Sequence, residues 1–424
     1  MRFFLPDSQD LVDPSFDFET EDRSPGRLRH RDDQYAHEVF SRRAYDGLLI
    51  SKGIVEGFGS CSGRYSLAQR QRFLRQGAKV FTRADKCSWG NLSLMGDCGA
   101  FTYVNEELPP YSVDNVVAFY EEGRFDYGIS VDHVILDFQP AWDEVDCAEK
   151  HRAFARQEIT LTLAEAFLAR IRSSRMKLNP LGVAQGWSPK SYATAVKKLQ
   201  AMGYTYIALG GMVPLKTNEI LGCLHEIQNV LRPNIQLHLL GVTRVEEVLT
   251  FERLGVTSFD STSPLLKAFK DDKDNYYTLD GAYTAVRIPQ VEGNVKLKRS
   301  ITSGQVSQDK AIHLEQASLE AMRRFDKYET TLERVLDPLL EYNRLFGGSA
   351  KVEAAYRKVL QARPWEVCPC EVCKQLGYHV ILFRGAERNR RRGFHNIWTF
   401  YQRLHTNLGW NPVKGAPMTA EVYL

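Results

Sequence analysis

The strongest constraint on the fold is a regular alternation of short apolar runs with longer stretches whose apolar residues recur at helical spacing. The apolar runs lie at Gly47–Val55, Leu92–Gly96, Gly128–Ile135, Asn179–Ala184, Tyr204–Leu209, Ile235–Gly241 and Val256–Phe259. The helical stretches are His151–Ser174, Ser191–Met202, Asn218–Leu231 and Arg244–Leu254. Strands that alternate with helices of this length form a parallel sheet. The sequence therefore predicts an α/β protein.

The number of strands favours a closed barrel over an open sheet. The seven runs, with an eighth at Ala282–Ile288, match the eight parallel strands of a (β/α)8 TIM barrel. An open doubly wound sheet is the alternative, but no G-x-G-x-x-G motif follows the first run, which weakens a dinucleotide site there. A length of 424 residues suits one barrel with an additional subdomain.

The character of the chain changes outside these runs, and this predicts four segments. Residues 1–46 are rich in charge and are interpreted as a leader or lid, and residues 47–290 as the catalytic barrel. Residues 291–362 are interpreted as a linker and helical insert, with helices at Lys310–Leu345 and Ala350–Ala362. Residues 363–424 complete the chain as a zinc-binding subdomain packed on the barrel.

Composition bounds the class of protein. Apolar content of 43% and charged content of 25% are ordinary for a soluble globular chain. The net charge of +3 is too small to demand a nucleic-acid partner by itself. The cysteines outside one cluster are scattered without pairs, and no run approaches the length of a membrane span. The sequence therefore predicts a cytoplasmic protein with no membrane partner.

The one cysteine cluster predicts a metal site. Cys368, Cys370 and Cys373 have the spacing C-x-C-x2-C, and His395 follows at the start of a predicted helix, Asn396–Leu404. Three cysteines and one histidine fill a tetrahedral site without an open position, which is typical of structural zinc. His379 and His405 are alternative fourth ligands, and an incidental grouping of cysteines is the alternative to a metal site.

Polar residues occur where the predicted strands end. Asp97, Asp132 and Asp260 lie at or just beyond three such ends, and Gln185 and the pair Gly210-Gly211 at two others. Active sites of (β/α)8 barrels are built at the carboxyl ends of the strands. An aspartate in this position is also a common helix N-cap, but three of them together favour a site.

These residue types suit chemistry at a bond between a base and a sugar. Two carboxylates flanking an anomeric carbon supply an acid/base and a nucleophile. A third carboxylate with an amide and backbone N–H groups suits the polar edge of a purine. Phe101, which follows Asp97 closely, could stack on such a base.

The order of these motifs resembles the tRNA-guanine transglycosylase superfamily. The motifs that carry the resemblance are Asp97-Cys-Gly-Ala-Phe101, Ala184-Gln-Gly, Gly210-Gly-Met, Leu240-Gly-Val, Phe259-Asp260, the cysteine cluster and His395-Asn-Ile. They run from Asp97 to about Leu404, most of the chain. The family has a (β/α)8 barrel with a zinc subdomain near its C-terminus.

The resemblance implies a role for each matching residue. Asp97 would be the general acid/base and Asp260 the nucleophile that attacks C1′ of a guanosine. The base would be held by Phe101, Asp132, Gln185, Gly210, Gly211, Met212 and Leu240. A free 7-deazaguanine would then displace Asp260 from C1′. The resemblance implies one structural zinc per chain, and neither ATP nor a catalytic metal.

Departures from the tRNA enzymes favour the DNA-modifying branch. Cys98–Ala100 replaces a Ser-Gly-Gly segment, Ser261–Pro264 replaces a Pro-Thr-Arg segment, and Lys310–Leu345 is a polar insert. These features resemble the DpdA-type enzymes, which place 7-cyano-7-deazaguanine (preQ0) into DNA. The resemblance implies DNA, free preQ0 and a partner protein from the same modification system as partners. A tRNA enzyme is the first alternative. A catalytically silent nucleic-acid-binding barrel and a glycosidase or nucleoside hydrolase are the others.

Basic residues crowd around the cysteine cluster and are predicted to contact phosphates. They are Lys374, Arg384, Arg388, Arg390, Arg391 and Arg392. Such contacts give affinity that depends on salt and not on base sequence. A solvated loop is the alternative for the run Arg388–Arg392.

Overall fold

The computed structural model describes residues 1–59, 61–348, 351–411 and 416–417. The chain divides into two compact units, and each is discontinuous in sequence. The first comprises Met1–Gln9, Tyr45–Thr262 and the described residues after Arg403, and the second comprises Asp10–Ala44 and Ser263–Arg403. The segment boundaries predicted from the sequence stay a prediction.

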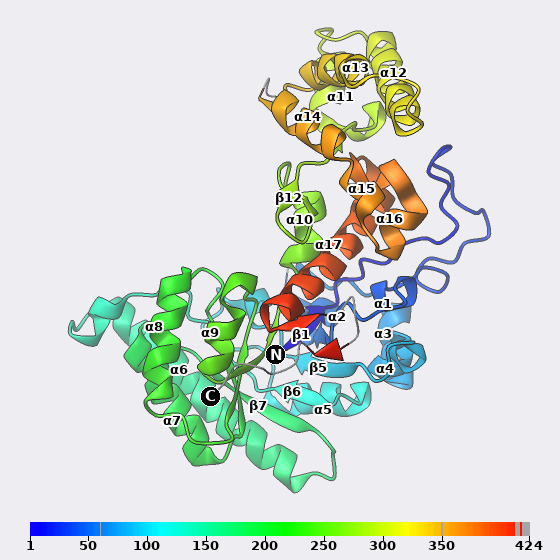
Figure 1. The fold of residues 1–424 in the computed structure, drawn as a ribbon. Helices are drawn as coiled ribbons and strands as arrows, with labels where there is room; N and C mark the ends of the chain where they lie inside the picture. The colour runs from blue at the N-terminus through cyan, green and yellow to red at the C-terminus, as the bar shows by residue number, and fades with distance from the viewer. Residues whose placement is uncertain (60, 349–350, 412–415, 418–424) are drawn as a thin grey trace. The chain divides into compact units, whose positions relative to one another are not determined.

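The first unit is a closed barrel of parallel strands in the order β1-β10-β9-β8-β7-β6-β5-β2 (Figure 1). The strands are β1 (Arg2–Pro6), β2 (Gly47–Ser51), β5 (Ser93–Asp97), β6 (Tyr127–Ile129), β7 (Asn179–Ala184), β8 (Tyr206–Leu209), β9 (Gln236–Leu239) and β10 (Val256–Asp260). The registers pair Ser51 with Asp97 and Leu209 with Leu239, so several strands end at one mouth. The predicted barrel is confirmed.

The prediction for the eighth strand is wrong. Strand β1 closes the barrel, because Phe3 pairs with Phe259 and Leu5 with Leu48. The segment Ala282–Ile288 instead contains two-residue strands outside the barrel, β12 (Ala282–Tyr283) and β13 (Val286–Arg287). They pair with β11 (Tyr276–Tyr277) and β14 (Leu382–Phe383). The physical reason is burial: the rings of Phe3 and Phe4 are fully buried and close the barrel wall.

The helices of the first unit surround the strands (Figure 1). They are α2 (Lys52–Glu56), α3 (Leu67–Gln76), α4 (Ala78–Phe81), α5 (Val113–Gly123), α6 (Ala148–Ser173), α7 (Pro189–Met202), α8 (Thr217–Gln228) and α9 (Val248–Arg253). Local sequence fixes their ends. In α7 the Ser188 hydroxyl accepts the Ser191 N–H, Pro189 occupies the first turn, and Gly203 with φ 101° ends the helix.

The barrel interior is packed with apolar side chains from alternate strand positions. They are Phe4, Leu49, Met95, Ile129, Leu181, Val183, Tyr206 and Ala208. Leu240 and Tyr127 pack against this core from its edge. The interior is thus filled, and ligands can enter only at its ends.

The second unit is mainly helical. Its helices are α1 (Ala36–Val39), α10 (Ser263–Lys270), α11 (Val295–Thr302), α12 (Gln308–Asp326), α13 (Leu332–Leu345), α14 (Val352–Ala362), α15 (Pro364–Val367), α16 (Glu371–Leu376) and most of α17 (Gly385–Asn407). The predicted helix Lys310–Leu345 is two helices, because the chain turns at Tyr328 with φ 60°. Helix α17 begins at Gly385, so His395 lies within this helix and not at its start.

Among the described residues, the structure has no helix with the length and apolar character needed to cross a membrane.

Candidate active site and metal-binding site

The mouth of the barrel holds a cavity bounded by three carboxylates. Asp97 ends β5, Asp260 ends β10, and Asp132 follows β6 by three residues. The cavity is lined by Leu49, Asp97, Ala100, Phe101, Asp132, Val134, Gln185, Gly210, Gly211, Leu240, Gly241 and Asp260. The structure therefore brings together the strand-end residues that the sequence singled out. Met212, in contrast, is fully buried and is not among the lining residues.

Asp97 has a strong tendency to hold a proton. Burial, together with the negative charges of Asp132 and Asp260, raises the pKa of Asp97 to about 7. Hydrogen bonds from Ser51 and from the Gly99 N–H, at 3.0 Å, oppose this shift. A carboxyl group that titrates near neutrality can both give and take a proton at pH 7.

Asp132 is held from both oxygens. The Cys98 thiol donates to Oδ1 at 3.2 Å, and the Gln185 amide donates to Oδ2 at 2.6 Å. Burial raises the pKa of Asp132 to about 6, and these two donors hold it lower than burial alone would. The Tyr103 hydroxyl donates to the Asp132 carbonyl at 3.1 Å, which fixes the backbone at the same point. Cys98 therefore orients Asp132 and does not itself line the cavity.

Gln185 is fixed by a close approach to two glycines. Its Oε1 accepts the Ile135 N–H at 3.2 Å, while Nε2 points to Asp132. A Cβ on Gly210 would lie 2.2 Å from the Gln185 Nε2. Gly211 has φ +71°, and a Cβ there would lie 2.5 Å from the Ile135 carbonyl oxygen. The two glycines therefore make room for the amide that orients Asp132.

We expect Gly210→Ala to lower the free energy of unfolding by about 1–3 kcal/mol, because the new methyl group displaces the Gln185 amide from Asp132 and leaves buried polar groups unpaired. Unfolding in denaturant, followed by circular dichroism, measures this value. Gly222→Ala is the matched control, since Gly222 lies in α8 and its nearest neighbour would be 3.9 Å away. That control should gain up to about 1 kcal/mol of stability. Equal stabilities for the two variants would contradict the close packing of Gly210 against Gln185.

The recorded hydrogen bonds hold the Asp260 carboxylate through one of its two oxygen atoms. Its Oδ1 accepts the His238 Nε2–H and the Gly241 N–H, each at 3.1 Å. The glycine at 241 has φ +72°, which turns its N–H toward the carboxylate. Both hydrogen bonds that the structure records for this carboxylate go to Oδ1 and none goes to Oδ2. Asp260 also lines the cavity.

Sequence reasoning missed two residues that touch these carboxylates. Ser51 is the last residue of β2 and pairs with Asp97. The predicted run Gly47–Val55 extends beyond Ser51, so this strand end was placed too late in the sequence. His238 lies inside the apolar run Ile235–Gly241, two residues before Leu240. A lone histidine on the inward-facing side of a barrel strand was the signal that could have identified it.

The cysteine cluster forms the predicted four-ligand group. The ligand atoms of Cys368, Cys370, Cys373 and His395 all lie within 4.8 Å of one another. His395 Nδ1 is 3.6, 3.4 and 3.3 Å from the three sulfur atoms. A tetrahedral ion with metal–sulfur bonds of about 2.3 Å and a metal–nitrogen bond of about 2.0–2.1 Å separates such atoms by about 3.6 Å. The four side chains therefore fit one metal ion.

The surroundings of His395 support metal binding through Nδ1. Its Nε2 donates to the Tyr277 carbonyl at 2.7 Å, so in the neutral imidazole the proton lies on Nε2 and the Nδ1 lone pair is directed at the sulfur atoms. The Tyr276 ring stacks on the imidazole with centroids 4.1 Å apart, and its hydroxyl lies 3.2 Å from the Cys373 sulfur. The rival His379 is instead bonded to Glu19.

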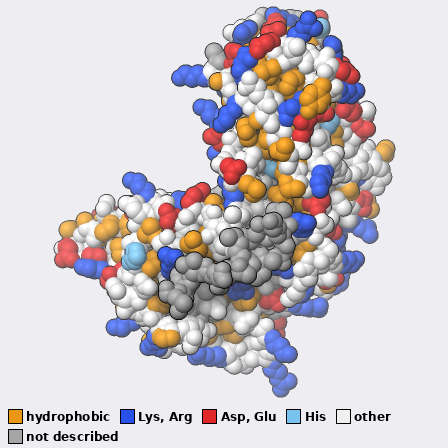
Figure 2. Space-filling view, viewed as in Figure 1, with side chains coloured by type: hydrophobic (Ala, Val, Ile, Leu, Met, Phe, Trp, Pro, Cys, Tyr) orange, Lys and Arg blue, Asp and Glu red, His pale blue; other side chains and the backbone are white. Residues whose placement is uncertain are grey.

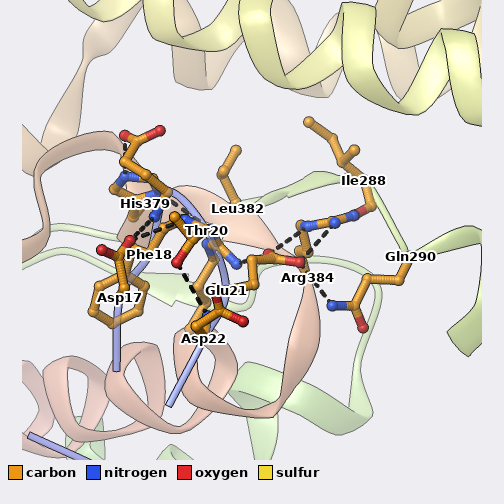
Figure 3. A network of polar contacts seen from close by, with 12 residues as sticks. Asp17, Phe18, Thr20, Glu21, Asp22, Ile288, Gln290, His379, Leu382 and Arg384 are labelled. Atoms are coloured by element: carbon orange, nitrogen blue, oxygen red, sulfur yellow. Dashed lines mark hydrogen bonds and ion pairs between the residues drawn. The ribbon is translucent and has the colours of Figure 1, made fainter. Parts of the chain in front are cut away.

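Four of the predicted phosphate-binding arginines are buried and paired inside the second unit. Arg384, Arg388, Arg391 and Arg392 have at most 5% of their surface exposed. Arg384 makes two hydrogen bonds of 2.7 Å to Glu21, which also binds Arg388 and Gln290 (Figure 3). Burial would raise the pKa of Glu21, but its arginine partners hold that pKa at about 2.

The other two buried arginines bind backbone carbonyl groups. Arg391 donates to the Asp13 carbonyl at 2.8 Å, and Arg392 to the Leu382 carbonyl at 2.9 Å. To reach a phosphate, each arginine would have to leave its buried partners, which costs more free energy than a surface contact returns. The phosphate role predicted for these four residues is therefore contradicted. Arg388 and Arg391 fasten residues 13–21 to helix α17, and Arg384 does the same from just before that helix.

Lys374 and Arg390 are the two predicted phosphate contacts that stay at least partly exposed. On the face shown in Figure 2, lysine and arginine side chains are interspersed with acidic ones and form no continuous basic patch. The arrangement agrees with the small net charge of +3.

The first unit is a (β/α)8 barrel whose mouth brings three carboxylates to one cavity, at the end of the barrel where enzymes of this fold carry their active sites. No family model matches the chain. A DNA-guanine transglycosylase of Salmonella montevideo is 49% identical over 412 residues, which cover 96% of this chain and 97% of that protein. The chain therefore belongs to the guanine transglycosylases of the tRNA-guanine transglycosylase superfamily, and it is a pentosyltransferase.

Proposed function

We propose that this enzyme exchanges a guanine base in DNA for free 7-deazaguanine, preQ0, through a covalent bond between Asp260 and C1′. The observation that carries the proposal is the meeting of Asp97, Asp132 and Asp260 at one cavity. The relative that is 49% identical bears the name of a DNA-guanine transglycosylase, which supports DNA over tRNA as the polymer.

The base binds between the exposed ring of Phe101 and the apolar side chain of Leu240, which both line the cavity. Asp132 and Gln185 read its polar edge, and the backbone of Gly210 and Gly211 closes the pocket. Because the base must enter this cavity, the target nucleotide leaves its stack before reaction. Met212 contacts the base through its backbone and not through its side chain, which is buried outside the cavity.

The exchange then proceeds in two displacements at C1′. Asp260 attacks C1′ through Oδ2 while Asp97 donates a proton to the departing guanine. The free base next occupies the same pocket, Asp97 takes the proton from its N9, and N9 displaces Asp260. Each displacement inverts C1′, so the product keeps the original configuration.

The metal site serves the structure of the second unit. We propose zinc as the ion, because three thiolates and one imidazole leave it no open position. The reaction belongs in the cytoplasm, where such thiolates stay reduced. Lys374 and Arg390 remain as proposed phosphate contacts, and a partner protein from the same modification system is proposed to assist binding.

The test is base exchange with purified protein and radiolabelled preQ0, with duplex DNA and unmodified tRNA offered separately at low salt. Label in DNA alone is the expected result. Label in tRNA alone would assign the polymer to tRNA. Release of guanine without label would indicate a hydrolase, and neither reaction in zinc-loaded, folded protein would indicate a barrel that only binds or that needs a partner.

The two displacements should depend on pH in opposite directions. Asp97 has a pKa of about 7, so its protonated form is lost as pH rises through 7. Guanine release needs the acid and slows above about pH 7, whereas incorporation needs the base and slows below it. Single-turnover rates for the two halves, measured from pH 5.5 to 8.5, check this. Both halves following one common limb would contradict the dual role of Asp97.

A further inference from the structure

A continuous chain of buried hydrogen bonds runs from Asp260 into the barrel interior. Asp260 Oδ1 is 3.1 Å from His238 Nε2, and His238 Nδ1 is 2.6 Å from the Ser258 hydroxyl. That hydroxyl is bonded to the Tyr206 hydroxyl, which lies 3.3 Å from the Arg2 guanidinium. The chain joins strands β10, β9, β8 and β1 of the barrel.

The two ends of this chain have fixed roles in its hydrogen bonds. An arginine only donates hydrogen bonds and an ionised carboxylate only accepts them, so Arg2 donates to Tyr206 and His238 Nε2–H donates to Asp260. With Tyr206 donating to Ser258 and Ser258 donating to His238 Nδ1, all the bonds run in one direction and the ring proton of His238 lies on Nε2, next to Asp260.

The middle of this chain is buried, and its arginine end is partly buried. His238 and Ser258 are fully buried, and Tyr206 is 5% exposed. The Arg2 guanidinium lies 5.1 Å from the centroid of the Tyr127 ring and 2.8 Å from its hydroxyl, and 5.6 Å from the Phe4 ring. Arg2, which packs against two aromatic rings at the far end, favours the arrangement in which the Tyr206 and Ser258 hydroxyls donate toward His238.

We propose that His238 is a positioning residue for Asp260 and that Ser258, Tyr206 and Arg2 act through it by fixing its tautomer. The inference rests on the proposed role of Asp260 as nucleophile and extends it. His238 and the Gly241 N–H both hold Oδ1, so Oδ2 is the oxygen presented to C1′. The carboxylate is thereby held in one orientation before the polymer arrives, which lowers the entropy lost on reaching the transition state.

Matched variants of His238 test this inference. A glutamine amide reaches approximately where Nε2 lies, whereas an asparagine amide reaches only where Nδ1 lies. We expect His238→Gln to stay within about tenfold of the native kcat, and His238→Asn and His238→Phe to lose about 100-fold or more. The KM for the free base should stay within about threefold in all three, because the base is read elsewhere. The single-turnover rate of covalent adduct formation should fall in parallel with kcat.

Ser258→Ala separates tautomer control from packing, since it leaves the imidazole in place. We expect a loss in kcat between those of His238→Gln and His238→Phe. The fold should stay intact with a lower thermal midpoint, because Tyr206 and His238 Nδ1 each lose a buried partner. If His238→Phe does not fold, this variant and His238→Asn decide the question. Native kcat in folded His238→Asn and Ser258→Ala would overturn the inference.

Asp260→Asn in the same assays distinguishes the two proposals. An inactive Asp260→Asn together with active His238→Asn means that only the positioning role fails. An active Asp260→Asn means that the proposed nucleophile itself is wrong.

Discussion

Asp260→Asn is expected to lower base exchange by about 1,000-fold or more and to abolish the covalent adduct with DNA. The amide oxygen can still accept the His238 and Gly241 hydrogen bonds that Oδ1 accepts now, so the side chain keeps its place. What is lost is the negatively charged oxygen that attacks C1′. Adduct formation with preQ0 omitted, followed by denaturing electrophoresis, measures the loss directly.

Asp126→Asn is the matched control for this substitution. Asp126 accepts the Leu94 N–H at 2.8 Å beside the amino end of β6, and an asparagine oxygen can accept the same bond. Its activity should therefore stay within about threefold of native. An adduct of normal amount in Asp260→Asn would show that another residue attacks the sugar.

Cys370→Ser is expected to remove the bound metal and to lower the thermal midpoint by on the order of 10 °C. A serine hydroxyl is not a thiolate ligand, and Cys370 Sγ also accepts the Cys373 N–H at 3.4 Å in a fully buried position. Metal content by mass spectrometry and a thermal melt measure the two effects. Chelation of the native protein should reproduce the lower midpoint.

Cys147→Ser makes the same chemical change where no metal is expected. Cys147 is partly exposed and is the N-cap residue of α6, a position that serine favours. Metal content and midpoint should both stay native in this variant. Full metal content in Cys370→Ser would mean that the cluster does not hold the ion.

The sequence predicted the parts of the fold that depend on local periodicity. Seven barrel strands and the helices α6, α7, α8 and α9 were found because each carries its own pattern over several residues. Strand β1 was missed because Phe3, Phe4 and Leu5 form a run too short to show alternation. Its place in the barrel depends on pairing with Phe259, a contact that no local pattern contains.

The difference between local patterns and long-range contacts also explains which residues of the candidate site were predicted and which were missed. Asp97, Asp132, Gln185 and Asp260 were predicted because strand ends of a parallel barrel meet at one mouth. The buried arginines near the cysteine cluster were misassigned because their partners lie far away in sequence, as with Arg384 and Glu21 or Arg391 and Asp13. Charge in a sequence does not distinguish a solvated side chain from a buried ion pair. His238 was missed because its function depends on a chain of contacts across four strands.

The position of β1 also determines how late in synthesis the barrel can form. Phe3 pairs with Phe259, so β1 can complete the barrel only after a strand more than 250 residues further along the chain has been synthesised. As long as β1 and β10 are not paired with each other, each has an unpaired edge that can pair with another chain. Barrel closure should accordingly be a slow step dominated by long-range contacts. We expect refolding yield to fall with rising protein concentration, even where the finished barrel is stable.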